Sequence, residues 1–108
     1  MTINNRFQQI IKSPRPVLVH FYARWCQPCH QLLPVLKTIK KVFKENIRII
    51  KVNVDDNPSI ASLWRIKSLP TLILFQSGNV KWMNEGVLDS SELTGILRKF
   101  AASESHQQ

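Results

Sequence analysis

The sequence predicts a single α/β domain, residues 1–108, in which a mixed four-stranded sheet carries helices on both faces. Apolar runs of β-type composition alternate with stretches in which apolar residues recur at helical spacing. One run, residues 17–23, is apolar at both alternations except at His20, as in a central strand buried on both faces. The chain is also long enough to bury a core without disulfide bonds to staple it.

The first half of the chain is expected to fold as helix, strand, helix and strand. Helical spacing predicts a helix over residues 3–12, which ends before two closely spaced prolines because proline cannot continue a helix. After the central strand, an apolar stripe opposite a face of lysines predicts a helix over residues 29–43, and Pro34 inside it is expected to kink it. Residues 47–54 are rich in β-branched side chains and predict a second strand.

The second half is expected to fold as helix, strand, strand and helix. Asn57 and Pro58 offer an N-cap and a first helical residue for a short helix that ends near Trp64. Residues 71–75 and 80–83 predict two strands joined by a turn, and therefore an antiparallel hairpin. The first two strands should be parallel because a helix joins them, and the third should run parallel to them after its crossover.

The last helix has a well-defined predicted start. Asp89 can cap it, and Glu92, three residues later, can hydrogen-bond back to the backbone N–H of Asp89. Leu88 and Leu93 can form a hydrophobic staple. The polar residues 103–108 are expected to fray.

Positive charge is concentrated in the first half of the chain. Residues 1–51 hold ten Lys and Arg against one acid, which gives +9, and residues 52–108 hold five against six, which gives −1. We interpret the lysines as a solvated helix face. Such charge can attract nucleic acid or an anionic membrane, but no nucleic-acid motif accompanies it and no apolar run reaches the ~18 residues of a membrane span. Neither partner is therefore expected.

The residues with the clearest chemistry are Cys26 and Cys29, where a strand is expected to give way to a helix. A thiolate is the nucleophile and the leaving group of thiol–disulfide exchange, and a helix N-terminus stabilises it. Cys26 falls where the helix begins, and Cys29, one turn later, is placed to attack a mixed disulfide formed on Cys26. Three alternatives fit the same residues. They are a structural cysteine pair, the Cys-x-x-Cys-His haem pattern completed by His30, and a zinc site that adds His20, His30 or His106.

Further residues fit one pattern. They are Trp-Cys-Gln-Pro-Cys at residues 25–29, Pro34 in the following helix, Leu-Pro-Thr at residues 69–71 before the third strand, Gly78 and Gly86. In this order the chain resembles the thioredoxin family over residues 17–100. The resemblance favours disulfide exchange over the haem and zinc alternatives.

The resemblance also implies roles for the matching residues. Cys26 would be the attacking cysteine and Cys29 the resolving one. Pro70 would be the cis-proline packed against the disulfide. Leu69 would hydrogen-bond an extended substrate chain, and Trp25 would form a flat apolar wall beside the disulfide.

Gln27 and Pro28, between the cysteines, are also expected to contact the substrate. Pro28 has no N–H and so removes a donor that could stabilise a thiolate, which favours a reductant. The reducing members of the family share this proline, whereas Gln27 stands where they usually have glycine.

His20 stands where thioredoxins have a buried acid that helps take the proton from the resolving cysteine. A neutral histidine can act as a base for Cys29, whereas a protonated one would stabilise thiolate. Lys51, on the neighbouring strand, would disfavour protonation. We expect a neutral His20, and release of the mixed disulfide that is slower than in a relative that carries the acid; a histidine hydrogen-bonded in the core is the alternative.

The chain before Val17 is too short to hold both the predicted helix and the extra strand with which typical thioredoxins begin. Residues 47–54 should then form an exposed edge strand of the sheet, which could pair with another chain. The charges of Arg48 and Lys51 could disfavour such pairing. A monomer is expected, and a dimer through this strand is a hypothesis.

The sequence thus predicts a thiol–disulfide oxidoreductase that reduces protein disulfides and needs no metal or bound cofactor. Its partners would be disulfide-containing proteins and a thioredoxin-reductase-like electron donor. The N-terminal residues lack the apolar core of a signal peptide, which favours the cytoplasm. Two alternatives stay open: an oxidant or isomerase in an oxidising compartment, and a client-binding module of the same fold.

Overall fold

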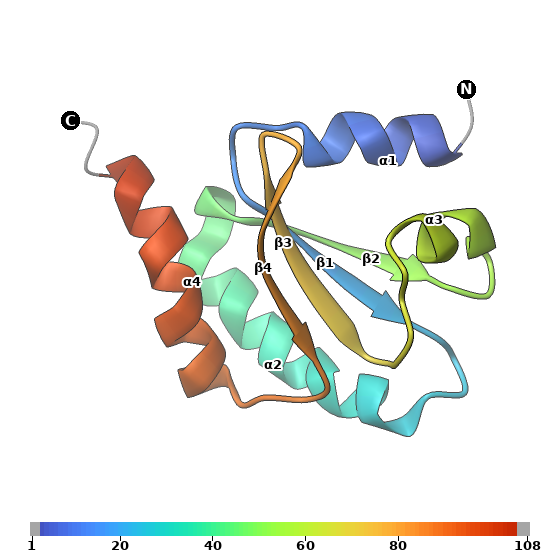
Figure 1. The fold of residues 1–108 in the computed structure, drawn as a ribbon. Coiled ribbons are helices and arrows are strands. Elements are labelled where there is room, and N and C mark those ends of the chain that lie inside the picture. The colour runs from blue at the N-terminus through green and yellow to red at the C-terminus, as the bar shows by residue number, and fades with distance from the viewer. Residues whose placement is uncertain (1–2, 106–108) are drawn as a thin grey trace.

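A computed structural model describes residues 3–105, with helices packed on both faces of a four-stranded sheet (Figure 1). The strands are β1 (Val17–Tyr22), β2 (Arg48–Asn53), β3 (Thr71–Gln76) and β4 (Asn79–Glu85). The helices are α1 (Ile3–Ile11), α2 (Gln27–Phe43), α3 (Pro58–Leu63) and α4 (Ser90–Ser105), and a 3-10 turn, η1 (Lys44–Asn46), follows α2. The predicted order of elements is confirmed.

The strands lie in the order β2-β1-β3-β4, so β2 and β4 form the edges. β1 and β2 are parallel, and β3 and β4 antiparallel, as predicted. The prediction that β3 is parallel to the first two strands is wrong, because β3 runs antiparallel to β1. β2 ends where Asn53 faces Tyr22, and β3 begins where Thr71 faces Phe21. The connection therefore starts and finishes at one end of the sheet instead of crossing back.

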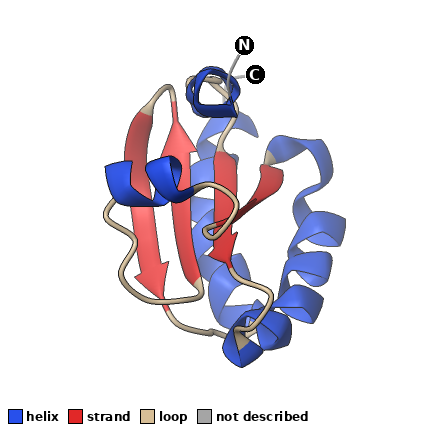
Figure 2. Cartoon of the chain, turned by 90° about the vertical axis from the view of Figure 1, so that its right-hand side faces the viewer, coloured by secondary structure: helices blue, strands red, loops and turns tan. Residues whose placement is uncertain are grey.

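The sheet buries one cluster of apolar side chains on each face. Figure 2 shows α3 in front of one face, with α2 and α4 behind the other. The cluster under α2 and α4 consists of Leu18, Leu32, Leu36, Ile39, Phe43, Ile47, Leu72, Leu74, Leu88, Leu93, Leu97 and Ala101. The cluster under α1 and α3 consists of Phe7, Ile11, Val17, Val19, Phe21, Val52, Ile60, Ile73 and Phe75. β1 contributes alternate residues to both, so it is the doubly buried strand that its composition predicts.

The helix ends agree with the sequence in part. Asp89 caps α4, because its Oδ1 accepts a hydrogen bond from the backbone N–H of Glu92 at 2.8 Å. α4 continues to Ser105, into the segment that was expected to fray, and residues 106–108 lie outside the described part of the chain. Asn57 precedes α3 as predicted but does not cap it through its side chain, which donates instead to the carbonyl of Asn53 at 3.0 Å.

A turn and a loop far apart in sequence are joined at one end of the sheet. Ser77 and Gly78 form the predicted turn between β3 and β4, and both have positive φ, 53° and 83°, which a two-residue hairpin turn requires. Their backbone N–H groups donate to the carbonyls of Ser13 and Ile11 at 2.8 and 2.9 Å. The side chain of Gln76 donates to the carbonyl of Pro14 at 2.9 Å. We call this set of hydrogen bonds the turn–loop contact.

Candidate active site

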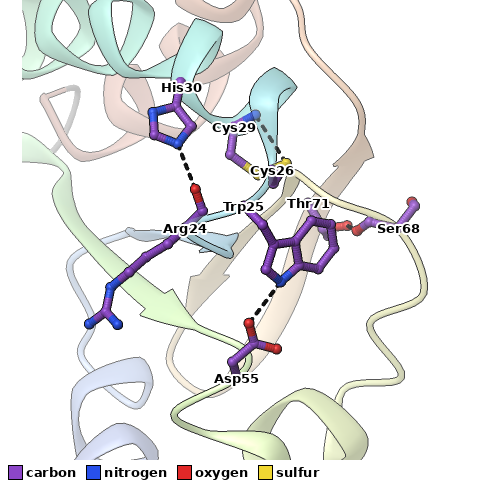
Figure 3. Close-up of a disulfide and its surroundings, with 8 residues drawn as sticks. All are labelled: Arg24, Trp25, Cys26, Cys29, His30, Asp55, Ser68 and Thr71. Atoms are coloured by element: carbon purple, nitrogen blue, oxygen red, sulfur yellow. Dashed lines mark hydrogen bonds between the residues drawn. A yellow bond between two sulfur atoms is a disulfide. The ribbon is translucent and has the colours of Figure 1, made fainter.

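Cys26 is the N-cap residue of α2. Its backbone is extended, with φ −86° and ψ 107°, and the helix begins at the next residue. Its Sγ accepts a hydrogen bond from the backbone N–H of Cys29 at 3.2 Å (Figure 3). The sulfur thus accepts from an N–H group that has no carbonyl partner within the helix, and it lies at the positive end of the helix dipole. Both favour a negative charge on the sulfur.

Cys26 and Cys29 are joined by a disulfide, and their Cα atoms lie 5.3 Å apart. Both residues are buried, and the pair packs with Ala23, Tyr22, Val54 and Leu69. The structure therefore brings the two cysteines together as the spacing predicts. Cys26, although buried, also contributes to the surface beside the start of α2.

A groove of about 550 Å³ lies at that surface. It is lined by Trp25, Cys26, Gln27, Pro28, Val54, Ile66, Lys67 and Leu69. Four of the predicted substrate-binding residues therefore share one concave surface with Cys26, the predicted attacking cysteine. Pro70 is buried and does not line the groove; its peptide bond with Leu69 is cis, as the resemblance implies.

Trp25 stands at the mouth of the site and is 72% exposed, so it is not a core residue. Its indole Nε1 donates a hydrogen bond to Oδ2 of Asp55 at 2.8 Å (Figure 3). Asp55 was not predicted as a site residue, yet the topology offers a signal. The carboxyl ends of the parallel strands β1 and β2 lie at the same end of the sheet. Trp25 follows β1 and Asp55 follows β2.

His20 is buried on the α2 face of β1, next to Lys51 of β2. Neither ring nitrogen has a hydrogen-bond partner in the described structure, so the alternative of a hydrogen-bonded core histidine is not supported. Burial, and to a smaller extent the nearby charge of Lys51, together lower the pKa of His20 to about 4. The ring is therefore neutral at pH 7, as expected.

His20 and Cys29 line the same small cavity, of about 90 Å³. Its other lining residues are Tyr22, Arg24, His30, Leu33 and Lys51. The sequence predicted the proximity of His20, Cys29 and Lys51 but not the contribution of His30. His30 is hydrogen-bonded through Nε2 to the carbonyl of Arg24 at 3.0 Å (Figure 3).

The other histidine of the zinc alternative, His106, lies outside the described residues. Within residues 3–105, no three His, Cys, Asp or Glu side chains lie close enough together to hold a metal ion. Among the helices that the structure describes, none is long and apolar enough to cross a membrane.

Known proteins resemble this chain over most of its length. The family model for Thioredoxin matches residues 1–99. The chain belongs to the thioredoxin family. A thioredoxin from Porphyra purpurea is 40% identical over 93 residues, which are 86% of this chain and 87% of that protein. A thioredoxin-like protein from Synechocystis sp. is 38% identical over 96 residues, 89% of this chain and 91% of its own length.

Solved structures of thioredoxins have the same fold. A mutant thioredoxin from Halobacterium salinarum has a TM-score of 0.80 and 29% identity, and the match covers 90% of this chain and 84% of that one. The oxidised mitochondrial thioredoxin 3 of Saccharomyces cerevisiae has a TM-score of 0.78 and 28% identity, with 86% and 87% covered. Membership in the thioredoxin family and the disulfide-forming pair Cys26–Cys29 together support a thiol–disulfide oxidoreductase.

Proposed function

We propose that this protein reduces disulfide bonds in other proteins through the dithiol of Cys26 and Cys29. The observation that carries the proposal is the position of Cys26, the N-cap of α2, beside the groove of about 550 Å³. The helix terminus stabilises its thiolate. The groove gives an extended protein segment a surface on which to bind next to that sulfur.

The reaction transfers two electrons from the dithiol to the substrate disulfide. The Cys26 thiolate attacks one sulfur of the substrate disulfide and forms a mixed disulfide with it. The substrate S–S bond breaks, and the other substrate sulfur leaves as a thiolate that takes a proton from water. Cys29 then loses its proton and attacks Sγ of Cys26. The mixed disulfide breaks, the second substrate sulfur leaves, and the Cys26–Cys29 disulfide forms, as it stands in this structure.

His20 receives the proton of Cys29 in this scheme. The two residues line one cavity of about 90 Å³, which has room for bridging water because a water molecule occupies about 30 Å³ in the liquid. With a pKa of about 4, His20 is a weak base for a thiol whose ordinary pKa is about 8.5. It therefore holds the proton only briefly, and release of the substrate is the slow step.

The direction of the reaction depends on Pro28. The helix position after Gln27 carries no N–H because it is proline. The thiolate of Cys26 thus has one fewer donor in the first turn, which destabilises the reduced form and favours electron donation. The electron donor that regenerates the dithiol would be a thioredoxin-reductase-like protein, and the site of action the cytoplasm.

The first test is the redox equilibrium of Cys26 and Cys29, followed by thiol trapping in dithiothreitol and glutathione buffers. A potential near roughly −270 mV, as for thioredoxin, supports the reductase. A value of about −180 to −120 mV contradicts it and supports an oxidant or isomerase. A Cys29→Ser variant should in addition accumulate a mixed disulfide on Cys26, because the resolving thiol is missing. If a Cys26→Ser/Cys29→Ser protein kept full biological activity, the client-binding alternative would stand instead.

A further inference from the structure

The outer edge of β2 presents backbone groups that no strand pairs within residues 3–105. The N–H of Arg48 donates to the carbonyl of Pro16, and the N–H of Val54 to that of Tyr22, both at 2.9 Å. In a parallel ladder, alternate residues face the partner strand. Residues 48, 50, 52 and 54 therefore face β1, and the backbone N–H and C=O groups of Ile49 and Lys51 point away from the sheet.

A groove borders this edge on each face of the sheet. On the α2 face, a groove of about 370 Å³ has Leu33, Leu36 and Ile49 among its lining residues. On the α1 and α3 face, a groove of about 220 Å³ is lined in part by Phe7, Ile10, Val52 and Ile60. Successive side chains of a strand point to opposite faces. A strand added to β2 would thus place its side chains alternately in the two grooves.

The two grooves differ in charge. The groove on the α2 face also includes Lys37, Lys40 and Lys51, whereas Arg6 and Lys51 are the basic residues of the other. No Asp or Glu is among the described residues that line either groove. A second copy paired through its own β2 would bring the same lysines against these, and like charges on neighbouring strands repel. The edge is therefore complementary to an acidic segment and not to itself.

We propose that the outer edge of β2 binds an extended segment of a partner protein, with acidic side chains on the α2 face alternating with apolar side chains on the α1 and α3 face. Backbone hydrogen bonds to Ile49 and Lys51 hold the segment as an added strand. The lysines of the α2 face select its acidic residues. This surface is separate from the groove beside Cys26, so the inference does not depend on the proposed function.

The probe is a synthetic peptide of alternating glutamate and valine, about eight residues long, labelled for fluorescence anisotropy and added to the full chain at low salt. The peptide is expected to bind and to shift and protect the backbone amides of Ile49 and Lys51 in NMR spectra. A Lys37→Glu/Lys40→Glu variant should bind it at least about tenfold more weakly, because two attractions become repulsions. The matched control, Lys81→Glu/Lys99→Glu, makes the same change in net charge away from this edge and should bind as the unchanged protein does.

Four results would overturn the inference. One is failure of the glutamate peptide to bind at millimolar concentration, and another is equally tight binding of a lysine–valine peptide. The third is protection of the Ile49 and Lys51 amides in the free monomer, because the edge would then be covered within the chain. The fourth is a dimer with these amides protected, which would make a second copy the occupant. Lys37 and Lys40 are exposed helix residues, so their replacement is expected to leave the fold intact.

Discussion

The indole of Trp25 and the carboxylate of Asp55, thirty residues apart in sequence, are joined by a hydrogen bond of 2.8 Å. Trp25 is largely exposed, and an exposed side chain without such a bond would sample several rotamers. The bond to Asp55 fixes the ring as one wall of the groove beside Cys26. Asp55 therefore positions Trp25 at the groove.

Replacement of Asp55 by Ala should free the indole and weaken the binding of protein substrates. We expect the second-order rate constant for reduction of a disulfide-bonded protein to fall by about three- to tenfold, equivalent to about 0.7–1.4 kcal/mol. The rate with a small disulfide, which needs no groove, should not change. Asp56→Ala is the matched control, because Asp56 pairs with exposed Arg24 at 3.6 Å and not with Trp25. Equal losses in both variants would contradict the role of Asp55.

His20 should make the stability of the fold depend on pH. The unfolded chain binds a proton at this residue below pH of about 6.5, but the folded chain only near pH 4, because its pKa is lowered to about 4. Between these values the unfolded state binds more protons, so stability falls as the pH falls. Above pH of about 6.5, titration of His20 does not lower the free energy of unfolding. By about pH 4 it has lowered the free energy of unfolding by about 3 kcal/mol.

This pH dependence can be measured by urea unfolding of the oxidised protein across that pH range. A His20→Leu variant has no titrating group at the position, so its free energy of unfolding should change less between pH 6.5 and 4. The carboxylates titrate in both proteins, and their contribution cancels in the comparison. Parallel curves for the two proteins would show that the pKa of His20 is the same in the folded and unfolded chain, and would contradict the lowered pKa.

The resolving step should accelerate when His20 is replaced by Asp. Burial, the larger of the two influences at this position, would raise the pKa of a carboxyl group against the opposing charge of Lys51, and a base with a raised pKa accepts a thiol proton more readily than the present imidazole. We expect release of substrate from the mixed disulfide to be about tenfold faster at pH 7, measured by stopped-flow tryptophan fluorescence. His20→Asn is the control without a base. If neither variant changed the rate or its pH profile, a proton-transfer role for His20 would be excluded.

Pro28 should set the reduction potential through its missing N–H. In a Pro28→Ala variant, the new N–H lies in the first turn of α2, where an N-cap side chain accepts hydrogen bonds. A donor to the Cys26 thiolate worth about 1.5 kcal/mol would raise the potential by about 30 mV. Pro34→Ala, inside the same helix, is the control and should leave the potential unchanged. A lower potential for Pro28→Ala would contradict this account.

The cap of α4 should contribute measurably to stability. Asp89→Ala removes the acceptor for the N–H of Glu92 and should lower the free energy of unfolding by about 1 kcal/mol. Thermal and urea unfolding measure this change, and Ser91→Ala at an exposed neighbouring position is the control. The redox potential should not respond, because α4 supplies no residue to the groove beside Cys26.

The sequence predicted the elements of the fold better than their pairing. Strand β1 and the cap of α4 follow from local patterns, apolar runs and a capping residue at the right spacing. The direction of β3 does not follow from a local pattern. It depends on the path of residues 54–70, which no local pattern encodes. The side chain of Asn57 likewise bonds backward to Asn53, a contact that a capping rule based on residue type does not include.

The site was predictable where its residues belong to a short motif, to neighbouring strands or to the pattern of the family. Cys26 and Cys29 are joined as their spacing indicates, and the neutral state of His20 follows from burial and from Lys51. Ile66 and Lys67, which line the groove, and Asp55, which accepts the hydrogen bond of Trp25, were missed because they come from other parts of the chain. A single acid or lysine in a loop does not indicate a site until it is known which strand ends lie next to one another.

The turn–loop contact has a consequence for how the length of this chain can vary. The turn at residues 77–78 and the loop after α1 are held together mainly by backbone groups, which any residue except proline at a donor position can supply. Most substitutions there should therefore be tolerated, except at Ser77 and Gly78, whose positive φ values of 53° and 83° disfavour most residues, and at Gln76, whose side chain makes one of the hydrogen bonds. Insertions should not be tolerated, because one extra residue in the turn would move its N–H groups out of register with the carbonyls of Ile11 and Ser13. Relatives that lengthen one of these two segments should therefore be found to have altered the other.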